Sequence, residues 1–133
     1  MAETVFDGVE GVMAAVGRHL GYSAWLEMTQ ERMDRFAAAT GDQHCEFLTL
    51  SLVNYFLPQV VEVRGISMGV NYGANQVRFP AAVSPGTRLR GGAALVGAVA
   101  VAGGVQATMV ITVEVEGEGQ PACVVEALSR YLA

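Results

Sequence analysis

Two side chains with acid–base chemistry, Asp42 and His44, lie two residues apart in a short polar stretch of the sequence. A carboxylate and an imidazole placed together can hold a water molecule and remove its proton, and an unperturbed imidazole titrates near pH ~6.5. Both residues also have ordinary roles, because an Asp after a Gly is common in turns and a loop histidine often faces solvent. Asp42 and His44 are therefore the candidate catalytic pair, with a turn residue and a solvent-exposed loop residue as the alternatives.

The cysteines and the overall charge argue against several other kinds of site. Cys45 and Cys123 are far apart and match no CxxC or zinc spacing, so we expect reduced, partly buried thiols, no metal site and no cofactor. The net charge is −5 and all eight basic residues are Arg, which argues against a nucleic-acid partner. No stretch has the composition of a membrane helix or a secretory signal, so we expect no membrane partner and a cytoplasmic protein.

The first part of the chain carries helical spacing. Apolar residues within 9–20 fall on one helical face, with Asp7 available as a cap and Gly21 placed as a stop. Thr29 is expected to cap a second helix, which Gly41 ends. These signals predict two helices before residue 42.

A third helix is predicted for residues 47–57, with Pro58 closing it. This segment, FLTLSLVNYFL, is apolar nearly all round. A helix with apolar residues on every side is expected to be buried on every side.

The second half of the chain has a period of two. Residues 105–115 alternate between apolar and polar, which predicts a half-buried strand, and residues 87–101 and 122–131 are strand-like on both sides of it. The breaks at residues 103–104 and 116–119 indicate hairpin turns, so the three strands should be antiparallel neighbours. Helices followed by a meander indicate an α+β fold, in which the sheet curls around the buried helix.

Four segments carry a resemblance to one family: residues 36–42, 65–80, 83–90 and 120–124. They are similar, in order, to the pattern of the MaoC-like (R)-specific enoyl-CoA hydratases and dehydratases, and the match covers most of the chain. The resemblance implies a single hot-dog domain over residues 1–133, with a long curved antiparallel sheet wrapped around a central helix. It also implies an edge strand that a homodimer, or a dimer of dimers, would cover by sharing the sheet.

The same resemblance implies the chemistry. In this family a carboxylate and an imidazole spaced D-x4-H activate the water that adds to a trans-2-enoyl-CoA, and backbone N–H groups at the start of the central helix hold the thioester oxygen. Asp42 matches the carboxylate. Asn71, Tyr72, Asn75 and Arg78 lie in family-like positions and are the candidate substrate-binding residues, with a bulge or the polar face of the sheet as their alternative role.

The sequence departs from the family at the catalytic segment. Only residues 43–46 separate Asp42 from the predicted central helix, and about twenty residues of the family pattern are absent. The fifth position after Asp42 is Phe47 instead of His, and Glu46 stands where the family has a Gly. An anionic side chain there opposes a developing oxyanion. Either the gene lacks this loop or the sequence omits a segment of the natural chain.

The expected function is therefore a lyase that hydrates trans-2-enoyl-CoA to (R)-3-hydroxyacyl-CoA, with acyl-CoA or enoyl-CoA thioesters as its partners. The missing loop puts the activity of this exact chain in doubt. The alternatives are a catalytically crippled acyl-CoA-binding or structural subunit of a hot-dog assembly, and a hot-dog thioesterase.

Overall fold

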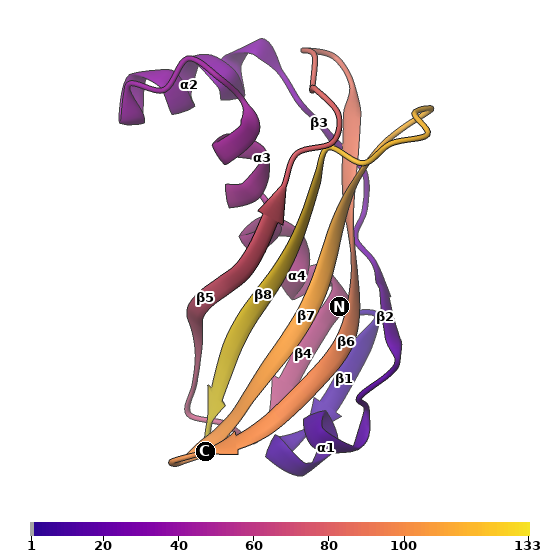
Figure 1. The fold of residues 1–133 in the computed structure, drawn as a ribbon, viewed down its shortest axis with the longest axis vertical. Helices are drawn as coiled ribbons and strands as arrows, with labels where there is room; N and C mark the ends of the chain where they lie inside the picture. The colour runs from indigo at the N-terminus through magenta and orange to yellow at the C-terminus, as the bar shows by residue number, and fades with distance from the viewer. Residues whose placement is uncertain (1) are drawn as a thin grey trace.

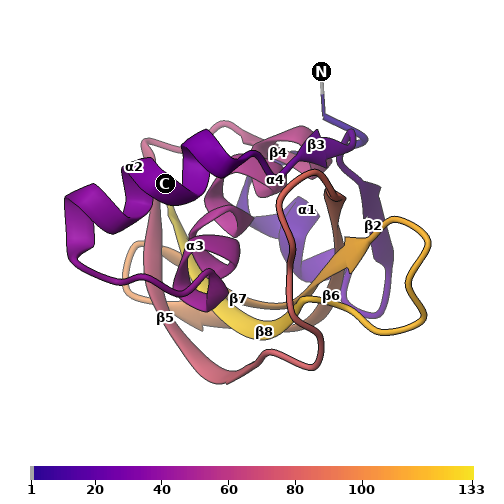
Figure 2. The same cartoon turned by 90° about the horizontal axis from the view of Figure 1, so that it is seen from above.

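The main feature of the computed structural model, which describes residues 2–133, is a long antiparallel sheet curved around short helices (Figure 1, Figure 2). The strand order is β2-β6-β7-β8-β5, and β3 also pairs with β6. The strands of this sheet are β2 (His19–Tyr22), β3 (Leu26–Glu27), β5 (Met68–Arg78), β6 (Arg88–Val101), β7 (Gly104–Val115) and β8 (Cys123–Leu132). The predicted hot-dog arrangement is confirmed.

The predicted meander of three strands is also confirmed. β7 pairs with β6 on one side and with β8 on the other, antiparallel in both cases. Every second side chain of β7 is buried, as the alternation predicts. Gly103 and Gly117 have φ angles of 80° and 82° in the two connecting turns, a backbone conformation that glycine adopts without strain.

Residues 2–133 form four helices: α1 (Gly8–Ala14), α2 (Gln30–Thr40), α3 (Glu46–Ser51) and α4 (Val53–Val60). The prediction for α2 is confirmed at both ends. The hydroxyl of Thr29 accepts a hydrogen bond from the N–H of Arg32 at 3.1 Å. Gly41 ends the helix with a φ of 77°, and its N–H donates to the carbonyl of Ala37.

The helix predicted for residues 9–20 is wrong over its second half. α1 ends at Ala14, Gly17 has a φ of 97°, and β2 follows as a strand that pairs with β6. Asp7 precedes α1 without making a side-chain cap hydrogen bond. Hydrogen bonding to the edge of the long sheet has overridden the helical spacing of these residues.

A separate sheet of two parallel strands was not predicted at all. β1 (Thr4–Asp7) pairs with β4 (Val61–Arg64), which directly follows α4. This pair lies beside the lower end of the main sheet in Figure 1, and Glu3 extends it by donating its N–H to the carbonyl of Gln59. The N-terminus is thereby attached to the end of the central helix.

The central helix differs from its prediction in two ways. It is divided into α3 and α4 at Leu52, and it continues through Pro58 to Val60. It is also buried on one side only, since Phe47 and Tyr55 are 58% and 52% exposed. Figure 2 shows the reason: the sheet curves around one side of α3 and α4 and leaves the opposite side uncovered.

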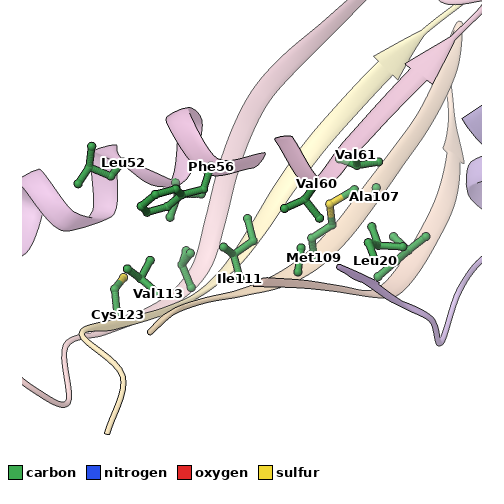
Figure 3. Close-up of a cluster of buried hydrophobic side chains, with 14 of the residues drawn as sticks. Leu20, Leu52, Phe56, Val60, Val61, Ala107, Met109, Ile111, Val113 and Cys123 are labelled. Carbon is green, nitrogen blue, oxygen red and sulfur yellow. The ribbon is translucent and has the colours of Figure 1, made fainter. Parts of the chain in front are cut away.

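The hydrophobic core lies between α4 and the concave face of the sheet (Figure 3). Phe56 is fully buried at its centre. Gly91 on β6 lies directly against it, because a Cβ atom at Gly91 would be 2.7 Å from the Cβ of Phe56. The absence of a side chain at this position therefore allows the helix to approach the sheet closely. Other core members are Leu20, Leu52, Val60, Val61, Ala107, Met109, Ile111, Val113 and Cys123.

Candidate active site

The connection between α2 and α3 contains both candidate catalytic residues. The carboxylate of Asp42 accepts a hydrogen bond from the backbone N–H of His44 at 2.9 Å. The N–H of Asp42 in turn donates to the hydroxyl of Thr40 at 3.1 Å. These contacts give Asp42 the role of a turn residue, and its bond to His44 involves the backbone of that residue instead of the imidazole.

His44 is exposed and is one of the residues that line a pocket of about 290 Å³ at the start of α3. Asp42 is not among the residues that line this pocket. Phe47 and Phe79 pack edge to face beside it, with their ring centroids 5.9 Å apart. The pocket is lined by Gln43, His44, Cys45, Glu46, Thr49, Phe79, Ala81, Ala82, Val83 and Ala122. The two candidates are thus neighbours in the chain but do not face a common space.

Both cysteines are free, and neither has the character of a nucleophile. Burial raises the pKa of the Cys45 thiol, and the charges of Glu46 and Asp42 raise it further. The thiol lies 3.5 Å from the carbonyl oxygen of Val83. Burial raises the pKa of Cys123 to about 11. Because the thiolate is the reactive form, these environments indicate structural thiols, as the spacing of the cysteines predicts.

The thiols give a prediction on reactivity and stability. At neutral pH we expect iodoacetamide to modify Cys45 more slowly than a free cysteine, and Cys123 only after unfolding. The pKa of Cys123 is higher in the folded state than in the unfolded chain, so between pH ~9 and 11 the unfolded chain loses the thiol proton while the folded state keeps it. The free energy of unfolding should therefore decrease as the pH rises through this range. Alkylation followed by mass spectrometry checks the first point, and urea unfolding over this pH range checks the second. Rapid native-state labelling of Cys123 would contradict both.

A longer groove runs between the central helix and the strands β5 and β8, and we call it the helix–strand groove. It consists of two adjoining pockets of about 410 Å³ and 200 Å³. Four residues line both pockets: Asn54, Leu57, Asn71 and Ser129. The larger pocket is mainly apolar, with walls that include Leu50, Val53, Ile111, Val125, Ala127 and Leu128. The groove therefore has the composition of a site for an aliphatic chain.

Two of the predicted substrate-binding residues lie in this groove. The Nδ2 of Asn71 donates to the Oδ1 of Asn54 across the groove at 2.9 Å. Tyr72 also borders the larger pocket, but its ring packs 3.6 Å from the guanidinium of Arg130, which is hydrogen-bonded to Gln106 on the outer face of the sheet. β5 also has a bulge between Asn71 and Gly73, so the alternative bulge role applies to the same segment.

The other two predicted residues lie on the opposite face of the sheet. The Nδ2 of Asn75 donates to Glu126 at 3.3 Å. Arg78 lines a separate pocket of about 190 Å³ with Gln76, Val110, Val124 and Glu126. The structure thus distributes the six candidates over the loop, the groove and the outer face of the sheet.

The sequence analysis did not identify four polar residues of the groove: Ser51, Asn54, Ser129 and Tyr131. Asn54 could have been identified from the sequence, because it is the only amide side chain in the apolar segment 47–57. Ser129 could have been identified as well, because it occupies an inward-facing position of β8 where the alternation predicts an apolar residue. Their proximity to Asn71 depends on the pairing of β5 with β8 and could not be deduced from either segment alone.

Two further expectations concern metals and membranes. Among residues 2–133 there is no group of three or more His, Cys, Asp or Glu side chains that could hold a metal ion. In the same part of the chain, no helix is both long enough and apolar enough to cross a membrane.

Known proteins provide clear similarities. No family model matches the chain. A 3-hydroxyacyl-thioester dehydratase Z of Mycobacterium tuberculosis is 40% identical over 148 aligned positions, which cover 96% of this chain and 98% of the relative. The nodulation protein N of Rhizobium leguminosarum bv. viciae is 34% identical over 133 aligned positions, covering 84% and 83% of the two chains.

Solved structures agree on the fold. A MaoC-like dehydratase from Rhodospirillum rubrum superimposes with a TM-score of 0.71 at 13% identity, covering 89% of this chain and 92% of the other. The (R)-hydratase from A. caviae involved in PHA biosynthesis gives a TM-score of 0.67 at 17% identity, covering 86% and 94%. At these identities the likeness establishes a shared hot-dog fold.

The alignments also measure how much of the relatives this chain lacks. The 148 aligned positions of the mycobacterial dehydratase match only about 128 residues here, so about twenty positions have no counterpart. The same comparison with nodulation protein N, 133 positions against about 112 residues, gives a similar number. The deficit of about twenty residues expected from the motifs is therefore present relative to two different relatives.

Proposed function

The chain belongs to the MaoC-like family of hydratases and dehydratases, and on this premise we propose that it binds trans-2-enoyl-CoA and (R)-3-hydroxyacyl-CoA thioesters in the helix–strand groove. These two thioesters are substrate and product of one reversible addition of water. The names of the relatives support both ends of this reaction, since one is a 3-hydroxyacyl-thioester dehydratase and a structural neighbour is an (R)-hydratase.

The shape of the groove supports a definite orientation for the ligand. The acyl chain lies along the apolar wall between the central helix and β8, beside Asn71 and Tyr72. The thioester lies towards the start of α3, where His44 and Thr49 line the neighbouring pocket. Asn75 and Arg78 stay predictions as substrate contacts, because their side chains lie on the other face of the sheet. The cytoplasmic location likewise stays a prediction.

The short connection between α2 and α3 limits the hydration rate that we expect of this chain. We place Asp42 and His44 in the catalytic roles, with Asp42 orienting the water and His44 as the base. Hydration by this pair is expected to be very slow, because Asp42 already accepts a hydrogen bond from the backbone N–H of His44 and does not line the pocket that His44 lines. Glu46 at the first position of α3 adds a negative charge where the enolate-like oxygen would develop.

The deficit of about twenty residues also favours a second candidate function. A chain that keeps the groove but lacks the catalytic segment is suited to be a binding or structural subunit of a hot-dog assembly. Titration with crotonyl-CoA and with a saturated acyl-CoA tests the common premise, and we expect both to bind. Absence of binding at high micromolar concentration would refute the ligand class for either function.

We further propose a homodimer in which β5 of two copies continues the sheet. β5 forms one edge of the sheet, and every residue of it except Val77 is exposed. Three of its exposed side chains are large and apolar: Met68, Val70 and Tyr72. A long, apolar and unpaired edge is what proteins normally cover by pairing. A partner strand there would also close the open side of the groove.

This proposal predicts the effect of charge on the edge. The wild-type chain of 14.0 kDa should sediment as a dimer, and the double variant Met68→Glu/Val70→Glu should sediment as a monomer, because like charges would meet across the two-fold axis. Val99→Glu, an equally exposed apolar position on β6, is the matched control and should remain dimeric. A monomeric wild-type protein at micromolar concentration would contradict the shared sheet.

A further inference from the structure

We propose that the helix–strand groove recognises acyl chains that carry a hydroxyl or oxo group well beyond C3, and that Asn54, Asn71 and Ser129 bind this oxygen. The inference rests on the proposed function, because it assumes an acyl thioester in the groove. It adds the class of acyl chain and the residues that select it.

The polarity of the lining changes along the groove. The larger pocket is lined mainly by aliphatic side chains, whereas its junction with the smaller pocket is bridged by the hydrogen bond between Asn54 and Asn71. Ser129 lies at this junction as well, and Tyr131 lines the smaller pocket beyond it. An unsubstituted alkyl chain that extends past the bridge would remove water from these amides without replacing its hydrogen bonds, which is unfavourable.

Two residues of the groove that carry hydroxyl groups, Ser129 and Tyr131, are buried. Ser129 and Tyr131 are 6% and 9% exposed, although they stand on the inner face of β8 among apolar residues. Burial raises the pKa of Tyr131, and a hydrogen bond with Ser129 lowers it in part. The phenol is therefore neutral at physiological pH, so both groups offer hydroxyl donors and acceptors instead of a charge.

The hydrogen-bonding capacity that remains free defines the ligand. After the bond between the two amides, Asn54 keeps both N–H donors and Asn71 keeps its Oδ1 acceptor. A hydroxyl group can accept from the first and donate to the second, and an oxo group can accept from the first. No charged side chain lines either pocket, which excludes a carboxylate or ammonium group as the favoured occupant.

The position of the cluster separates it from the reaction itself. Asn54 follows Glu46 by eight residues, which corresponds to ~12 Å along the helix from the end where the thioester is placed. The 3-hydroxyl group of the product lies next to the thioester and does not reach this far. The recognised oxygen therefore belongs to the distal part of a long chain.

Binding measurements with matched thioesters test the inference. Isothermal titration calorimetry would compare dodecanoyl-CoA with isomers of hydroxydodecanoyl-CoA in which the hydroxyl is moved along the distal half of the chain. We expect one position to bind about five- to tenfold more tightly than the unsubstituted chain, as one or two net hydrogen bonds would give. In the double variant Asn54→Leu/Asn71→Leu this gain should disappear and dodecanoyl-CoA should bind more tightly.

Two further variants make the result specific. Ser129→Ala removes a single hydroxyl and should reduce the gain for the same isomer by a few-fold. Gln76→Leu makes an amide-to-leucine change on the outer face of β5 and should leave the gain intact. Circular dichroism of each variant would show that the sheet is retained.

The possible outcomes separate this inference from the proposed function. If dodecanoyl-CoA binds and no hydroxylated isomer binds more tightly, the polar cluster does not select oxygenated chains and the inference is wrong. The inference also fails if the gain persists in the double Leu variant. If no CoA ester binds at all, the proposed function fails first and this inference fails with it.

Discussion

Crotonyl-CoA incubated with this protein should keep its conjugated enoyl absorbance for far longer than with a relative that has the complete D-x4-H loop, with kcat/KM lower by ~10⁴-fold or more. One positioned acid–base group typically contributes ~10²- to 10⁴-fold, and an oxyanion donor contributes on a similar scale. This chain has Phe47 where the family pattern has the spaced histidine, and Glu46 where it has the glycine of the helix start, so a negative charge lies beside the backbone N–H that would hold the oxyanion. Loss of absorbance at a defined enzyme concentration is the measurement.

Two substitutions and one insertion identify the cause of the low activity. Asp42→Asn and His44→Ala should each lower the already slow rate by only a few-fold, because residues that do not line a common pocket act poorly together on one water molecule. Insertion of a D-x4-H loop, taken from a member of the family that has one, between α2 and α3 should raise the rate by several orders of magnitude. Brisk turnover that both single substitutions abolish would show instead that His44 has replaced the missing base. Release of free thiol from a saturated acyl-CoA would indicate a thioesterase.

The largest effect on stability is expected at the contact between the central helix and the sheet. Phe56→Ala should lower the free energy of unfolding by about 3–5 kcal/mol, because the side chain is fully buried and its loss leaves a cavity. Phe47→Ala is the matched control. Since Phe47 is largely exposed, its substitution should change the free energy by less than about 1 kcal/mol. Guanidinium unfolding monitored by circular dichroism measures both values.

Gly91 provides an independent test of the same contact. Gly91→Ala would place a Cβ atom 2.7 Å from the Cβ and 3.0 Å from the Cγ of Phe56, so we expect a cost of about 1–3 kcal/mol from overpacking. In the Phe56→Ala background the added methyl group enters the cavity, and the cost should largely vanish. Additive effects of the two substitutions would contradict the close packing of α4 on β6.

The sequence predicts those elements whose signals are local. The period of two in β7, the glycines of its two turns and the cap of α2 each act within a few residues, and all are found as predicted. The predictions are wrong where the conformation of a segment depends on pairing with a segment far away in the sequence. His19–Tyr22 forms a strand because β6 offers it an edge, and the pairing of β1 with β4 joins two segments that are separated in the sequence by α1, α2, α3 and α4.

The candidate site shows the same division. Family-like spacing drew attention to Asn71 and Tyr72, which do line the groove. It could not distinguish them from Asn75 and Arg78, because the bulges in β5 change which side chains face inward. Asn54 and Ser129 come from a helix and a strand far apart in the sequence, so only the packing of the two elements places them beside Asn71.

The placement of α2 has a consequence for how this chain tolerates the loss of a segment. α2 has no fully buried residue and projects past the end of the sheet in Figure 1, and the loop after it contributes no fully buried side chain either. The helix and its loop therefore form a unit that can open without global unfolding, and insertions or deletions there leave the core intact. In evolutionary terms, a scaffold of this kind can lose or regain its catalytic loop while the fold persists. Mutations in the loop then change activity with little effect on the free energy of unfolding.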